Sequence, residues 1–116
     1  ESAAGIYEQG LNNPLPEDVR DKILRKLSYL HRCRGNLSGA VDLWLKAAGH
    51  RKVYAHVELA KYHEHKRRDF RRAKQWTLAA IDLVNQGGLQ PYSRDRWLRD
   101  LHRRLGRLRR KARLKT

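Results

Sequence analysis

The chain nearly superimposes on itself when it is shifted by 33 residues. Small residues then match small ones, and bulky residues match bulky ones. The matched pairs are Leu37 with Phe70, Ala40 with Ala73, Leu43 with Trp76, and Ala47 with Ala80. An alanine lets two helix backbones approach closely, and the bulky residue that follows it fills the space alongside. This period predicts repeated helical units that stack to bury one shared core.

Glycine and proline separate long segments of helical periodicity, and no segment alternates with a period of two. We therefore expect an all-α fold in which short loops join antiparallel helical hairpins. Pro16 is suited to open one helix, and Asp69 and Ser93 are suited to cap two others. The expected helices cover about 2–11, 16–34, 37–48 (or 38–48), 53–66, 70–85 and 93–114.

Two segments, about 21–50 and 53–86, resemble tetratricopeptide repeats, whose period is about 34 residues. The matching residues are Leu24, Leu27, Gly35, Leu37, Ala40, Trp44 and Ala47 in the first, and Leu59, Ala60, His63, Phe70, Ala73 and Ala80 in the second. The second segment departs from the pattern because Arg68 replaces the turn glycine and one extra residue precedes Asp69. The resemblance implies a single α-α superhelical domain with a capping helix at about 93–114.

The run from Val57 to His65, followed by Asp69 and Phe70, resembles the C-terminal helical-repeat region of bacterial proteins with a ribonuclease H-like exonuclease domain. In that family the nuclease domain comes first and carries the acidic metal ligands. The resemblance implies that this chain, which begins with Glu1 and contains no methionine, is an accessory domain cut from a longer protein.

Positive charge dominates the composition: 27 Lys and Arg residues against 12 Asp and Glu give a net charge of +15. Such a field attracts polyanions and speeds their encounter with the protein. Arginine supplies 18 of these cations and can bind phosphate with two hydrogen bonds. Nucleic acid or another polyanion is therefore the first partner that we expect, and the resemblance to the exonuclease family implies that DNA is favoured.

The segment after Ser93 holds 11 of the basic residues and two acids. Its apolar residues, from Leu98 through Leu101, Leu105 and Leu108 to Ala112, form one narrow stripe. If this stripe packs on the preceding helix, the cations face solvent. Three interpretations remain open: a capping helix with a merely soluble face, a helix that binds a nucleic-acid backbone, and a helix that binds a protein or a lipid surface.

Two further surfaces are candidate sites. A second basic cluster lies at the turn inside the second repeat, and the sequence does not show whether it shares a face with the tail helix. The nucleic-acid candidates on the two clusters are Arg99, Arg103, Arg104, Arg107, Arg110, Lys111, Arg67, Arg68, Arg71 and Arg72. The tetratricopeptide resemblance also implies a concave groove suited to an acidic peptide, with Lys22, Arg25, Lys26, Tyr29, Arg32 and Lys61 as its candidates.

No catalytic constellation can be assembled from the sequence. His63, Glu64 and His65 are adjacent on a helix, so their side chains point in different directions and are not expected to hold one ion. The single cysteine, Cys33, excludes an internal disulfide and fits a reducing, cytoplasmic setting. We expect no enzyme activity in this chain, no cofactor, no metal and no membrane span.

The sequence thus predicts a non-catalytic binding module, for which two hypotheses compete. The first is the accessory domain of a DNA-processing nuclease, which contacts phosphates without reading bases. The second is a scaffold that binds an acidic peptide or a protein partner, such as a helicase, through the groove.

Overall fold

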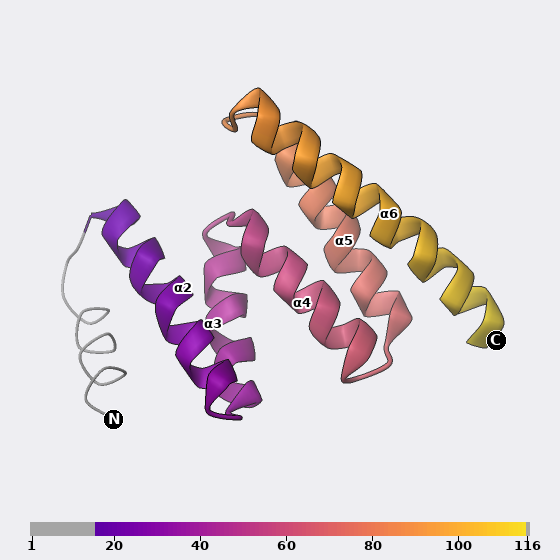
Figure 1. Cartoon of the computed structure of the whole chain (residues 1–116), viewed down its shortest axis with the longest axis horizontal. Helices are drawn as coiled ribbons and strands as arrows, with labels where there is room; N and C mark the ends of the chain where they lie inside the picture. Colours follow the sequence, from indigo (N-terminus) through magenta and orange to yellow (C-terminus); the bar gives the residue numbers. More distant parts are fainter. Residues whose placement is uncertain (1–15, 116) are drawn as a thin grey trace. The chain divides into compact units, whose positions relative to one another are not determined.

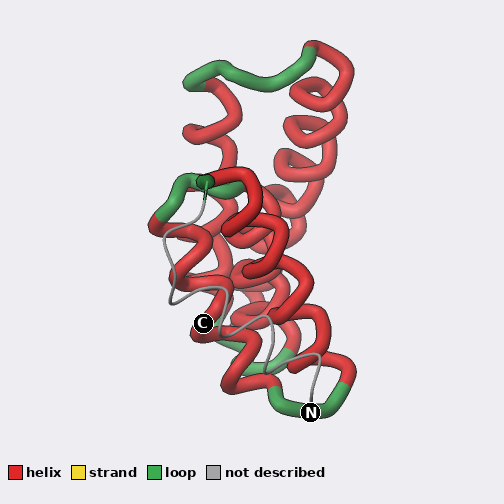
Figure 2. Tube along the Cα trace, turned by 90° about the vertical axis from the view of Figure 1, so that its left-hand side faces the viewer, coloured by secondary structure: helices red, strands yellow, loops and turns green. Residues whose placement is uncertain are grey.

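The computed structural model describes residues 16–115, and these residues are helical apart from the turns that join the helices, with no strand among them (Figures 1 and 2). The helix expected at 2–11 lies outside this range. The chain divides after His50 into two compact units. The first contains α2 (Glu17–Cys33) and α3 (Leu37–Gly49). The second contains α4 (Val53–His65), α5 (Phe70–Asn85) and α6 (Pro91–Lys115). The predicted all-α class is confirmed.

The first unit is a hairpin of two helices that pack against each other. Pro16 precedes α2, and Glu17 and Asp18 occupy its first turn. Acidic side chains at this position stabilise the helix because they lie near the positive end of its dipole. The buried residues recur on one face of each helix. They are Leu24, Leu27 and Ser28 on α2, and Ala40, Trp44 and Ala47 on α3.

The second unit is built from three consecutive helices, with α5 packed against both α4 and α6. Near the α4–α5 turn, Phe70 and Ala73 pack against Leu108. Towards the other end of α5, Ala80 and Val84 pack against Leu101. The apolar stripe of α6 therefore lies on α5, as the spacing of its leucines predicts.

The two hairpins, α2–α3 and α4–α5, turn in the same way. Gly35 and Arg68 both have positive φ, at 78° and 53°. In each turn the residue that follows, Asn36 or Asp69, is the N-cap of the next helix. The side chain of each cap accepts a hydrogen bond from the backbone N–H three residues on, at 3.1 and 3.2 Å. The α4–α5 turn is one residue longer, which places the predicted extra residue in the turn itself.

The two hairpins also bury side chains at equivalent positions. On the first helix of each, Leu27 and Ser28 correspond to Leu59 and Ala60, 32 residues on, and all four are buried. On the second helix the offset is 33, since Ala40, Trp44 and Ala47 correspond to Ala73, Thr77 and Ala80, which are buried as well. The two hairpins therefore bury residues at equivalent positions.

The structure corrects two helix starts. The first is that of α2, which begins at Glu17 with Pro16 as its N-cap. Ser93 does not cap α6, because α6 begins two residues earlier at Pro91. The N–H of Arg94 already donates to the carbonyl of Gln90 at 2.9 Å. Proline lacks an N–H and has a fixed φ, so it fits the first helical position, where no intrahelical bond is lost.

Candidate nucleic-acid interface

Glu64 is buried near the end of α4, and three cations of α6 surround its carboxylate. Its side chain has no exposed surface. Arg107 donates to both oxygens, from Nε to Oε2 at 2.8 Å and from Nη2 to Oε1 at 2.9 Å. Arg104 Nη1 donates to Oε1 at 2.9 Å, and Lys111 Nζ donates to Oε2 at 2.7 Å. This one carboxylate therefore binds α6 to α4 through four charge-assisted hydrogen bonds.

The surroundings of Glu64 determine its protonation. Burial on its own would raise the pKa of the carboxyl group. The hydrogen bonds from Arg107 and Lys111 outweigh that effect and lower the pKa to about 2. Glu64 in turn raises the pKa of Arg107. The carboxylate is thus ionised at neutral pH, and the network is a fully formed ion cluster.

This cluster corrects the expectation that the cations of the tail helix all face solvent. The side chains of Arg104, Arg107 and Lys111 are 16%, 36% and 31% exposed, and each is bound to Glu64. They lie three and four residues apart, on the flank of the apolar stripe. Glu64 follows Ala60 by four residues and so occupies a core position of α4. That spacing in the sequence indicates a buried Glu64, but Glu64 was considered there only as a metal ligand, a role that was rejected.

Phe70 joins the two basic clusters. The guanidinium carbon of Arg68, in the α4–α5 turn, lies 5.1 Å from the centre of the Phe70 ring. The ammonium of Lys111, on α6, lies 5.6 Å from the same centre. Both distances suit cation–π contacts. The turn cluster and the C-terminal half of α6 are therefore neighbours, which the sequence left undecided.

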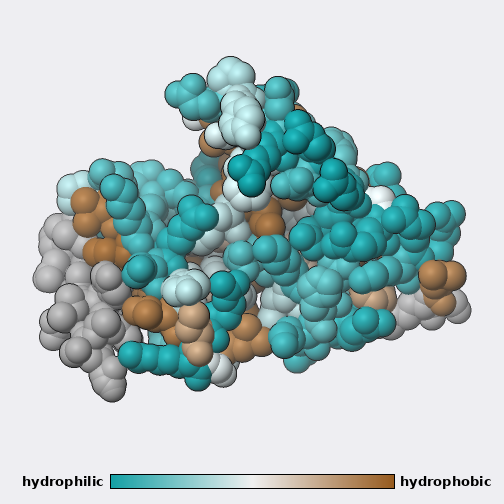
Figure 3. Space-filling view, in the orientation of Figure 1, coloured by the Kyte–Doolittle hydropathy of each residue, from teal (hydrophilic) through white to brown (hydrophobic). Residues whose placement is uncertain are grey.

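The remaining nucleic-acid candidates are exposed. They are Arg99, Arg103 and Arg110 on α6, and Arg67, Arg68, Arg71 and Arg72 at the turn. Arg72 pairs with Asp69 at 3.4 Å, and Arg103 lies 3.9 Å from Asp100. Such exposed pairs are weak and open readily to a competing anion. Figure 3 shows hydrophilic side chains gathered over the C-terminal half of α6 and the adjacent end of the α4–α5 hairpin.

The groove candidates fall into two groups. Lys22, Arg25, Lys26 and Tyr29 line a shallow hollow of about 490 Å³ on α2. Arg32 lies one turn further on, with its guanidinium carbon 5.5 Å from the centre of the Tyr29 ring. The sixth candidate, Lys61, is on α4 in the second unit, where it pairs with Glu58 at 3.6 Å. The structure thus brings the five α2 residues together on one helix face.

The histidines of α4 do not form a metal site, and no group of three potential ligands occurs among residues 16–115. His56 is buried, and its ring nitrogen Nδ1 lies 2.8 Å from the carbonyl oxygen of Lys52. Burial is the largest influence on His63 and lowers its pKa. His65 is exposed, with Nε2 at 3.6 Å from Glu64 Oε1.

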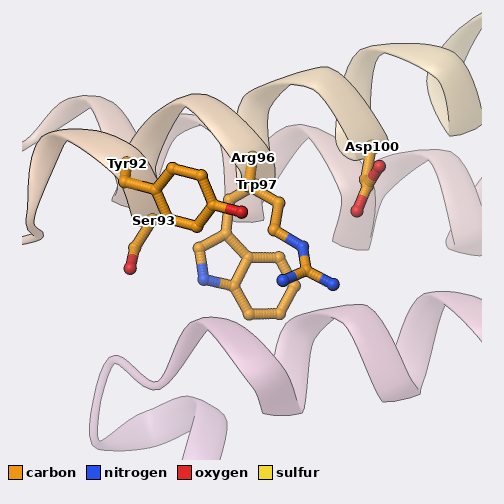
Figure 4. A pocket seen from close by; sticks show the side chains of 5 residues that line it. All are labelled: Tyr92, Ser93, Arg96, Trp97 and Asp100. Atoms are coloured by element: carbon orange, nitrogen blue, oxygen red, sulfur yellow. The ribbon is translucent and has the colours of Figure 1, made fainter.

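A second hollow, which the sequence analysis did not identify, lies on the N-terminal half of α6. It measures about 320 Å³ and is lined by Tyr92, Ser93, Arg96, Trp97 and Asp100. These five side chains project from one side of the helix (Figure 4). One side of Trp97 packs against the buried cluster of Ala80, Val84 and Leu101. Tyr92 is 76% exposed.

No protein-family model matches the chain, and comparisons with curated proteins and with solved structures give no match. The two resemblances noted in the sequence therefore remain hypotheses. Among the described residues, no helix is both long enough and apolar enough to cross a bilayer.

Proposed function

We propose that the chain is a non-catalytic binding module whose second unit contacts nucleic acid through its phosphates. The observation that supports this proposal is the adjacency of the basic α4–α5 turn and the basic C-terminal half of α6, because Arg68 and Lys111 both lie over the ring of Phe70. Between Leu101 and Lys115 the α6 sequence contains no acid, and the nearby carboxylate of Glu64 is already neutralised by its own partners. An anion that approaches this end of the unit meets little repulsion.

Within this proposal the cations of α6 have two roles. Arg104, Arg107 and Lys111 hold the helix in place through Glu64. Arg99, Arg103 and Arg110 are exposed and follow one another at four and seven residues, so they lie on one face. Phosphates bound to these residues would release condensed counterions, which supplies affinity without base recognition.

The tetratricopeptide-like architecture and the parent protein are part of the same proposal. The matched turns and the matched buried positions of the two hairpins support a repeat of one module. An accessory domain of a ribonuclease H-like exonuclease would use such a surface to hold substrate near an active site elsewhere in the protein. DNA is the favoured nucleic acid on this hypothesis.

The salt dependence of affinity tests the phosphate contacts. Binding of the whole chain to a fluorescently labelled duplex is measured by anisotropy between 50 and 300 mM salt. If about five phosphates are contacted, log affinity falls with log salt with a slope of about −4.5. A slope near zero, or no measurable binding at 50 mM salt, would contradict the proposal.

The alternative function is a scaffold that binds an acidic peptide or protein, with a helicase as one possible partner. The basic hollow on α2 favours it, because Lys22, Arg25 and Lys26 surround an exposed tyrosine. Carboxylates suit such a surface, and the tyrosine ring adds apolar contact area. A labelled poly-glutamate peptide that binds with the same affinity after Lys22, Arg25 and Lys26 are changed to Gln would exclude this site.

A further inference from the structure

We propose that the hollow at the N-terminal half of α6 is a stacking site for a base of single-stranded nucleic acid. This inference rests on the proposed function and adds a second, independent element to it. Phosphate contacts alone do not distinguish a single strand from a duplex. A site that stacks an unpaired base does, because the bases of a duplex are already stacked on one another.

The lining has the composition that base stacking requires. Tyr92 and Trp97 are two of the five residues, and both point into the hollow from the same side of α6 (Figure 4). Trp97 is fixed by its packing on the core, while the Tyr92 ring is exposed. The volume of about 320 Å³ is at the small end of ligand sites, which suits one or two flat rings.

The polar residues of the hollow favour a base over a phosphate as its occupant. Asp100 lies in the lining, and its negative charge would repel a phosphate that entered. The same carboxylate can accept a hydrogen bond from the N–H groups on the edge of a base, and Ser93 offers a hydroxyl group. Arg96 is also in the lining, and its guanidinium can bind the phosphate that links the stacked nucleotide to its neighbour.

The hollow adjoins the face of α6 that carries the exposed arginines: Tyr92 and Arg96 belong to that face, and Ser93, Trp97 and Asp100 lie on its flank. Tyr92, Arg96, Arg99, Arg103 and Arg110 follow one another at steps of four, three, four and seven residues. From Arg96 to Arg110 this row runs about 21 Å along the helix. Asp100, in the hollow, lies 3.9 Å from Arg103, the next cation of the row. A single strand that follows the arginines towards the N-terminus of α6 therefore reaches the hollow.

Two oligonucleotides of equal charge separate stacking from phosphate binding. One is a labelled 12-nucleotide thymidine strand, and the other is an abasic strand of the same length. The whole chain should bind the thymidine strand about tenfold more tightly at the same salt concentration, since stacking of one base is worth that factor or more. Tyr92→Ala should reduce this preference to less than twofold and leave the salt slope unchanged.

A control on the same helix is Leu114→Ala, which removes another exposed apolar side chain and should keep the full preference. Arg96→Gln should weaken binding of both strands by a similar factor and reduce the magnitude of the salt slope by about 0.7.

Equal affinity of the wild type for the two strands, with a steep salt slope, would overturn the stacking site but would not contradict the phosphate interface. A preference that survives Tyr92→Ala would also overturn it. Failure to bind either strand would instead contradict the proposed function.

Discussion

Glu64 is a buried anion that holds three cations of another helix, so its replacement leaves those charges close together without a counterion. Glu64→Gln should lower the free energy of unfolding by about 3 kcal/mol at pH 7, because breaking one side of a buried ion cluster leaves charges uncompensated. Urea unfolding followed by circular dichroism measures this change. The matched control is Glu58→Gln on the same helix, where the carboxylate pairs with Lys61 at 3.6 Å. A loss no larger than that of the control would contradict the role of Glu64.

The pKa of Glu64 gives the unfolding free energy a specific dependence on pH. The folded value is about 2, and the ordinary value is 4.5. The folded state therefore binds this proton more weakly than the unfolded state does. The stabilisation is complete above pH 4.5 and is lost as the pH falls towards 2, by roughly 3 kcal/mol in all. Urea titrations of the wild type and Glu64→Gln between pH 7 and pH 2.5 should converge, and parallel curves would refute this linkage.

The sequence predicts most of the buried residues of α6 but not their polar neighbours. A stripe from Leu98 to Ala112 is visible from spacing alone, because one helix face must be apolar to pack. The contact of Arg107 with Glu64 spans 43 residues of chain and depends on how α4 and α6 meet. The periodicity of one helix does not show how α4 and α6 pack against each other. The cations that bind Glu64 therefore cannot be distinguished in the sequence from those that face solvent.

Among the secondary-structure elements, the hairpin turns give the clearest test. Gly35 has a φ of 78°, and an added Cβ there would meet no atom within 4 Å. Gly35→Ala should therefore cost about 1 kcal/mol of unfolding free energy through backbone strain alone. Gly49→Ala is the matched control, since a Cβ there is equally unobstructed but φ is not positive. Thermal unfolding should show a lower Tm for Gly35→Ala and an unchanged or higher Tm for Gly49→Ala, and the reverse order would contradict this account of the turn.

The sequence locates the helices more reliably than their ends. The helices expected at 37–48, 53–66 and 70–85 agree with α3, α4 and α5 to within one residue at each end. Asp69 is the N-cap of α5, as predicted. For α6, the sequence favours Ser93 as the cap, but the helix begins at Pro91.

For the whole molecule, a net charge of +15 predicts attraction to polyanions but not where they bind. The structure divides the nucleic-acid candidates into two sets. One set holds the second unit together around Glu64, and the other is exposed at the α4–α5 turn and along α6. The five basic and tyrosine candidates on α2 form a separate surface in the first unit. The two proposed functions therefore use different parts of the chain.

The most direct test of the proposed interface compares two variants that each lose four positive charges. One changes Arg67, Arg71, Arg103 and Arg110 to Gln, and the other changes Lys22, Arg25, Lys26 and Arg32 to Gln. Circular dichroism verifies that both stay folded, and anisotropy measures their binding to the 12-nucleotide thymidine strand at 100 mM salt. The first variant should bind at least 30-fold more weakly than the wild type, with a salt slope reduced in magnitude by up to about 2.8. The second should bind within about threefold of the wild type, since only its long-range field is weakened. Equal losses in the two variants, or a larger loss in the second, would contradict a nucleic-acid interface on the second unit.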